Sequence, residues 1–196
     1  MQIIPFTLFA IAASGTPGPN NILVTASAAR NGVRATVPMI AGIAIGFALM
    51  LAVVGAGVSG VLAAVPAISA TLRWVAFAWL LWMAWHIAVA PPPGVAEARP
   101  PAGFWSMAAF QWVNPKAWLV ALGTVSAWIA PADAMLPQLV TIAVVFALVS
   151  IPCVGAWAVI GAAAGRLLRS PARLRAFNVA MAALLVASML PVVLGH

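Results

Sequence analysis

Charged residues are scarce in this 196-residue chain: only 6% of its residues carry a charged side chain, and only two of those are acidic. So few charges cannot cover the surface of a soluble domain of this size. The single cysteine, Cys153, excludes an internal disulfide, and the two histidines offer no clustered ligands for a structural zinc ion. We therefore predict neither a metal site nor a cofactor.

The same scarcity argues against an enzyme. A hydrolase or transferase site needs a paired acid and base, or a nucleophile beside a base. Ser14 is a hydroxyl near the most polar part of the first apolar run, but the sequence places no histidine close to it. We expect no enzymatic activity.

What the chain does contain is hydrophobic sequence, since 65% of its residues are apolar and its mean hydropathy is +1.14. This composition requires a lipid bilayer. A net charge of +7 would suggest nucleic acid in a soluble protein, but no basic face with interleaved aromatic residues occurs. The bilayer is thus an expected partner and nucleic acid is not, and the positive charge is better explained as a topology signal.

Apolar runs long enough to cross about 30 Å of hydrocarbon occur six times. They cover residues 3–29, 37–64, 68–90, 104–130, 136–164 and 174–194. A proline-rich linker, residues 91–103, follows the third run. The sequence therefore predicts an all-α membrane protein: one transmembrane domain over 1–196, with a three-helix repeat in 1–90 and another in 104–196.

Arginines set the expected orientation. Seven of them lie in connections on one side of the predicted spans, whereas Arg73 lies on the other side. The seven are Arg30, Arg34, Arg99, Arg166, Arg169, Arg173 and Arg175. By the positive-inside rule their side faces the cytoplasm, so both termini face outward. Because each repeat has three spans, the second repeat is inverted relative to the first.

The first predicted span is interrupted by Thr16, Pro17, Gly18, Pro19, Asn20 and Asn21. Two prolines and a glycine break the helix and free backbone groups that lipid cannot satisfy. The amides that begin the following half-helix suit a carboxylate, and the carbonyls just upstream suit an ammonium group or a cation. The break therefore matches the two ends of a zwitterion, although a proline kink that serves only helix packing is the alternative.

A second interruption, at Gln111, Asn114, Pro115 and Lys116, breaks the fourth span. Lys116 lies roughly 18 Å along that span, near the middle of the bilayer. No acidic residue is embedded to pair with it, so Lys116 lines a watery cavity, bonds the carbonyls of the first break, or meets an anionic group of a substrate; snorkelling to the surface is the alternative.

Two broken spans in corresponding halves point to a substrate site of a transporter. The expected substrate-binding residues are Thr16, Pro17, Gly18, Pro19, Asn20, Asn21, Gln111, Asn114, Pro115 and Lys116. Two glycine pairs with a spacing of four residues, Gly42 with Gly46 and Gly161 with Gly165, let helices approach closely, within one chain or between two copies.

Several motifs carry a resemblance to a known family. They are TPGPNNILV at 16–24, the basic stretch 30–34, the Asn114–Ala117 motif after Gln111, the glycines Gly42 and Gly46, the segment 79–85, and Asn178. Through them nearly the whole chain resembles the LysE/RhtB family of bacterial amino-acid exporters. The resemblance implies a multi-pass carrier of the inner membrane with six helices, which moves amino acids out of the cell and is driven by the proton gradient.

One departure from the family bears on the substrate. Phe47 stands where members commonly carry an acidic residue, and no Asp or Glu remains in any span. Proton-coupling candidates are then Lys116 and His86, and the substrate is expected to be a small neutral amino acid or a derivative, since no fixed negative charge would hold a cationic one. The alternatives are a metal-ion exporter of the same superfamily and a non-transporting membrane scaffold. A second copy of the chain, in a homodimer, is a further possible partner.

Overall fold

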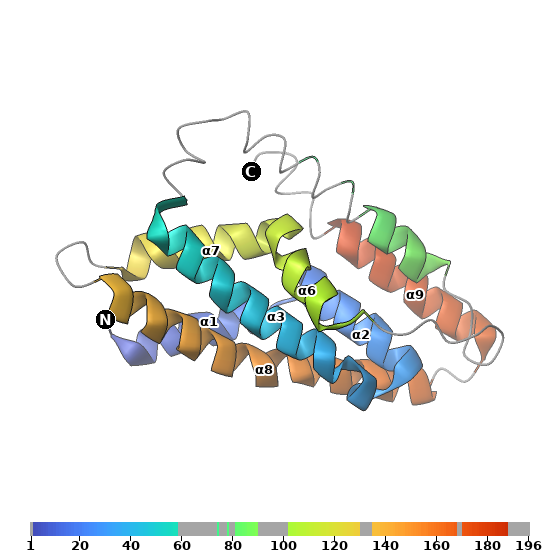
Figure 1. The fold of residues 1–196 in the computed structure, drawn as a ribbon. Coiled ribbons are helices and arrows are strands. Elements are labelled where there is room, and N and C mark those ends of the chain that lie inside the picture. Colours follow the sequence, from blue (N-terminus) through green and yellow to red (C-terminus); the bar gives the residue numbers. More distant parts are fainter. Residues whose placement is uncertain are drawn as a thin grey trace.

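A computed structural model describes residues 2–58, 74, 78, 81–89, 102–129, 135–167 and 170–187, and these residues form helices and short connections without any strand. The principal helices, in chain order, are α1 (Ile3–Gly15), α2 (Pro19–Asn31), α3 (Val33–Val53), α6 (Phe104–Phe110), α7 (Pro115–Trp128), α8 (Met135–Leu167) and α9 (Pro171–Ala187). Figure 1 shows them as one bundle. The predicted all-α membrane class agrees with this architecture.

Both predicted interruptions are present. The first predicted span is divided into α1 and α2, and the fourth into α6 and α7, which are joined by a single 3-10 turn at Gln111–Val113. Two helices are long and apolar enough to cross a membrane unbroken, over Val33–Gly57 and Met135–Leu167. Most of the third predicted span, with Trp79, most of the linker 91–103 and the end of the sixth span lie outside the described residues.

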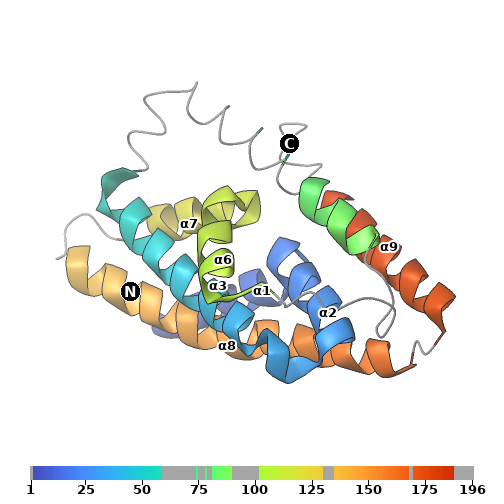
Figure 2. The same ribbon diagram turned by 45° about the vertical axis from the view of Figure 1, so that its right-hand side comes forward.

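The long helix α8 packs against α1, α2 and α3, and α3 packs in turn against α6. In Figures 1 and 2, α8 runs along one side of the bundle, and α9 lies with the short helical segment 81–89 at one end. Because α8 touches both α1 and α2, it spans the first break and holds its two halves in place.

The two glycine pairs form close helix contacts within the chain. On α3, Gly42 faces the backbone of Phe104 and Gly46 faces that of Ala108, whereas Gly161 and Gly165 on α8 face the backbone of Thr25 and Ala29. A Cβ atom at any of the four would collide with backbone atoms of the neighbouring helix. The glycines therefore serve packing inside one chain, and they give no argument for a dimer.

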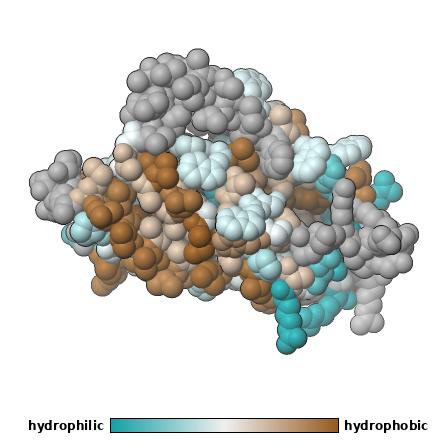
Figure 3. All heavy atoms as spheres, in the orientation of Figure 1, coloured by the Kyte–Doolittle hydropathy of each residue, from teal (hydrophilic) through white to brown (hydrophobic). Residues whose placement is uncertain are grey.

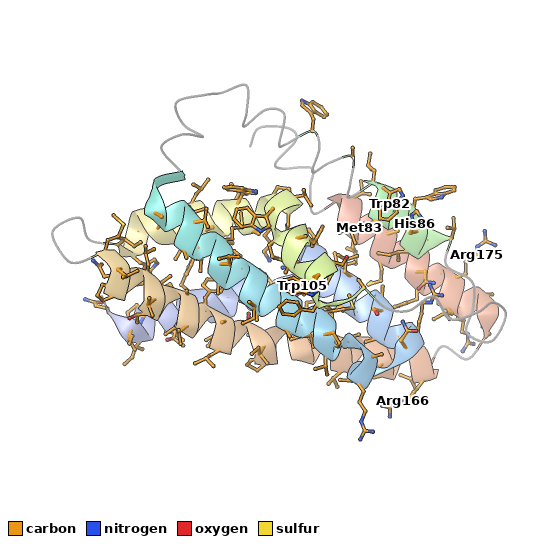
Figure 4. The ribbon with its side chains drawn as sticks, in the orientation of Figure 1. Trp82, Met83, His86, Trp105, Arg166 and Arg175 are labelled. Carbon is orange, nitrogen blue, oxygen red and sulfur yellow. The ribbon has the colours of Figure 1, made fainter. Side chains whose placement is uncertain are left out.

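Large apolar side chains cover the outside of α3 and α8. Val37, Ile45 and Leu49 are exposed on one face of α3, and α8 exposes a longer row of Val, Leu and Ile residues. Figure 3 shows this hydrophobic surface, with hydrophilic residues gathered toward the end where Figure 4 labels Arg166. We call this the arginine end, since Arg30 lies in the last turn of α2 and Arg34 in the first turn of α3. An apolar belt with charge at one end is what a membrane-embedded bundle requires.

Candidate functional site

The first break is short and extended. Helix α1 ends at Gly15, Thr16 and Gly18 have extended backbone angles, and α2 begins at Pro19. Proline is favoured at the first position of a helix because it has no amide hydrogen to satisfy there. The second break repeats the arrangement, since Asn114 is extended and α7 begins at Pro115.

The two breaks are joined by an amide clasp, formed by Asn20, Gln111 and Asn114. Asn20 Nδ2 donates to Gln111 Oε1 at 2.9 Å, and Gln111 Nε2 donates back to Asn20 Oδ1 at 3.1 Å. Asn114 Nδ2 also donates to Asn20 Oδ1 at 3.3 Å. Gln111 is fully buried and gives its second hydrogen to the carbonyl of Met107 at 2.9 Å. The clasp thus connects segments more than ninety residues apart in the sequence.

Changing Gln111 to Leu should loosen this clasp. The substitution leaves the side chain of Asn20 and the carbonyl of Met107 short of partners, and an unpaired buried polar group costs about 1–3 kcal/mol. We expect a net loss of about 2 kcal/mol, which lowers the melting temperature in detergent by about 6 °C. Gln2→Leu, at an exposed position without a side-chain cap bond, is the control; equal melting temperatures of the two variants would mean that the clasp does not stabilise the fold.

Lys116 binds the first break from the opposite half of the chain. Its Nζ donates to the carbonyl and the hydroxyl oxygen of Thr16 at 2.9 and 2.7 Å, and to the carbonyl of Pro17 at 3.3 Å. The lysine stem passes over Gly18, where a Cβ atom would lie 2.7 Å from Lys116 Cδ. Of the roles considered for Lys116, the structure has it bond the carbonyls of the first break and line a cavity.

Every carbonyl from Ala12 to Gly18 already accepts a hydrogen bond. The donors, in order of the carbonyls, are Thr16 N, Thr16 Oγ1, Asn21 Nδ2, Trp157 Nε1, Lys116 Nζ with a second bond from Asn21 Nδ2, Lys116 Nζ again, and Ile22 N. The expectation that these carbonyls receive an ammonium group of a substrate stays a prediction, although each of them already has a donor within the protein. The protein itself satisfies them, as buried backbone requires.

A cavity of about 50 Å³ lies at the junction of the breaks, room for a few water molecules. Five of the predicted residues line it: Gly18, Asn20, Asn21, Asn114 and Lys116. The other five predicted residues do not line the cavity, but they position residues that do. Thr16 and Pro17 hold Lys116, Gln111 holds Asn20, and Pro19 and Pro115 begin the half-helices.

The remaining lining residues were not predicted as site residues. They are Ala13, Ser14, Ile43, Phe47, Ala117, Val120, Phe146, Ser150 and Val154. Phe146, Ser150 and Val154 recur every four residues on one face of α8, but this spacing is also that of an ordinary packed helix. The rings of Phe47 and Phe146 contact each other at a tilt, with centroids 4.6 Å apart, and the ring of Phe6 packs on that of Phe146 with centroids 6.3 Å apart. The cavity therefore has an apolar aromatic wall.

His86 is not brought to this cavity. Its ring lies against that of Trp82, with centroids 4.2 Å apart, and its Nδ1 is 2.8 Å from the carbonyl of Trp82. Figure 4 shows both residues beside α9, away from the breaks. Trp82 and Trp85 are also more than half exposed, which fits anchoring better than stacking on a substrate.

Comparison with known proteins gives one consistent result. The sequence profile of the LysE type translocator family matches residues 11–193. A cysteine/O-acetylserine efflux protein of Salmonella typhimurium (strain LT2) is 34% identical over 188 residues, 95% of this chain and 94% of the relative. The cysteine/O-acetylserine efflux protein of Escherichia coli (strain K12) is 34% identical over 182 residues, 92% of each chain. No solved structure matches the sequence.

Proposed function

Because this chain belongs to the family of LysE type translocators, we propose that it exports small neutral amino acids, with cysteine and O-acetylserine as the first substrates to test. Family membership makes it a transporter, not an enzyme, and a multi-pass protein of the bacterial inner membrane. The observation that supports a substrate site is the cavity at the junction of the two breaks. In a scaffold protein that does not transport, we expect side chains to fill that junction.

In this proposal the substrate carboxylate binds at the start of α2. That helix has Gly18 at its N-cap and no side-chain cap, so the amides of its first turn have no partner within the helix. By contrast, α7 is capped by Asn114 Oδ1, which accepts from Lys116 N at 3.1 Å. The positive charge of Lys116 lies beside the same cavity and favours an anion.

A neutral side chain is favoured by the rest of the lining. None of the described residues around the cavity is acidic, so a cationic side chain would find no counter-ion. Ile43, Phe47, Phe146 and Val154 instead offer an apolar wall. The small volume also favours short side chains.

The arrangement of the spans in the membrane and the driving force of transport belong to the same proposal. We place six spans as two inverted repeats, 1–90 and 104–196, with a cytoplasmic linker at 91–103 and both termini outside. Proton antiport would use Lys116, which is the titratable side chain among the described residues that line the cavity. A homodimer is also part of the proposal, but the glycine pairs do not support it, because they face helices of the same chain.

Export from preloaded cells tests this function. Cells that make the protein should release labelled O-acetylserine and alanine several times faster than cells with an empty vector, whereas lysine should leave at the background rate. Antiport moves a proton inward for each substrate released, so acidifying the medium should speed export and an ionophore should abolish the increase. Release that is equal with and without the protein would reject the function; release that ignores pH and ionophore would reject only the antiport.

A further inference from the structure

Two buried oxygen atoms beside the cavity have no hydrogen-bond partner: Ser14 Oγ and Asn21 Oδ1. Both residues line the cavity, and Asn21 is only 3% exposed. A buried acceptor without a donor is rare and costs about 1–3 kcal/mol. Every carbonyl from Ala12 to Gly18 accepts a hydrogen bond within the protein, whereas these two side-chain oxygens beside the first break have no donor.

The orientation of the Asn21 amide is fixed by its other contacts. Its Nδ2 donates to the carbonyls of Ser14 and Thr16, both at 2.8 Å. Turning the amide over would place its oxygen against two carbonyl oxygens, which repel it. The free atom is therefore an acceptor, and a ligand that satisfies it must bring a hydrogen-bond donor.

We infer that Asn21 Oδ1 and Ser14 Oγ form the subsite for the ammonium group of a small α-amino acid. The inference rests on the proposed function and deepens it, because it replaces the backbone carbonyls with two side chains as the acceptors. An ammonium group offers three donors and binds such acceptors by charge-assisted hydrogen bonds. The carboxylate of the same molecule then reaches the start of α2, of which Asn21 is itself a first-turn residue.

Ser14→Ala isolates this subsite. Ser14 Oγ makes no hydrogen bond within the protein, so its removal should leave the melting temperature of the purified protein unchanged or slightly raised. The dissociation constant for L-alanine, measured by thermal stabilisation of the purified full-length protein, should rise about tenfold. Ser106→Ala is the control, because Ser106 is exposed on α6 and lies outside the cavity lining, so this variant should bind L-alanine as the wild type does.

A second comparison uses ligands in place of variants. Propionate has the carboxylate and the methyl group of alanine but no ammonium group, so wild-type protein should bind it at least about a hundredfold more weakly. This comparison does not depend on whether a substituted protein folds.

The outcomes separate the inference from the proposed function. Equal affinity of Ser14→Ala and wild type for alanine, or equal binding of alanine and propionate, overturns the ammonium subsite. Failure of alanine, serine and O-acetylserine to stabilise the wild type overturns it as well. If alanine binds with the expected pattern but proteoliposomes show no counterflow, the subsite stands and export is rejected.

Discussion

Replacing Lys116 with Met should lower the rate of amino-acid export by about a hundredfold. The substitution removes three hydrogen bonds from Nζ to Thr16 and Pro17, and it removes the positive charge beside the cavity. Hydrogen bonds to a charged group contribute about 1.5–3 kcal/mol each, so the loss of two already corresponds to a factor of about a hundred. Initial rates of counterflow in proteoliposomes, normalised to the amount of protein, measure this effect.

Two further variants test whether the effect of Lys116→Met comes from the loss of its contacts with the first break. Leu119→Met is the control, since Leu119 is exposed on the same helix and lies outside the cavity lining. Thr16→Val removes the hydroxyl partner of Lys116, so the double variant should lose little more than Lys116→Met alone. Export by the Met variant at more than half the wild-type rate would mean that the lysine does not hold the site together.

Changing Gly161 and Gly165 together to Ala should cause the largest loss of stability. Each added Cβ would collide with the backbone of α2, at Thr25 or at Ala29, and backbone cannot move aside as a flexible side chain can. Overpacking costs about 1–3 kcal/mol at each site. We expect a total of about 4 kcal/mol and a melting temperature lower by about 12 °C.

The same chemical change elsewhere gives the control. Gly123 and Gly155 also lie in helices, but a Cβ atom at either position meets nothing within 4 Å. Their double change to Ala should raise helix propensity and leave melting unchanged or higher. If the two double variants melt alike, the close approach of α8 and α2 contributes nothing to stability.

The sequence predicted the parts of the site that depend on local chemistry. Pro19 and Pro115 mark the starts of α2 and α7, because proline ends one helix and suits the first turn of the next. The predicted fifth span, residues 136–164, became α8, since a long apolar run has few alternatives to a helix in a membrane, even with Pro152 inside it. An embedded lysine without an acid also had to find oxygen atoms somewhere, and the first break supplies them.

The remainder depends on three-dimensional packing that no local pattern encodes. Nothing in the sequence pairs Asn20 with Gln111, because many amides could satisfy either one. Trp157, from α8, donates to the carbonyl of Gly15 in the first break, and no local pattern in the sequence predicts this contact. The sequence shows Ser14 only as a hydroxyl without a nearby histidine, and the absence of a hydrogen-bond partner for its Oγ depends on the fold around it.

The contact of α8 with α2 limits access to the cavity from the arginine end. Gly165 meets Ala29 next to Arg30, and Gly161 meets Thr25 one turn deeper, so this contact lies between the arginine end and the cavity residues Asn21 and Val154. A solute that enters along these two helices can pass only while they are apart. Because backbone lies against backbone at both glycines, no side chain can swing aside to open such a path, and the two helices would have to move as whole units.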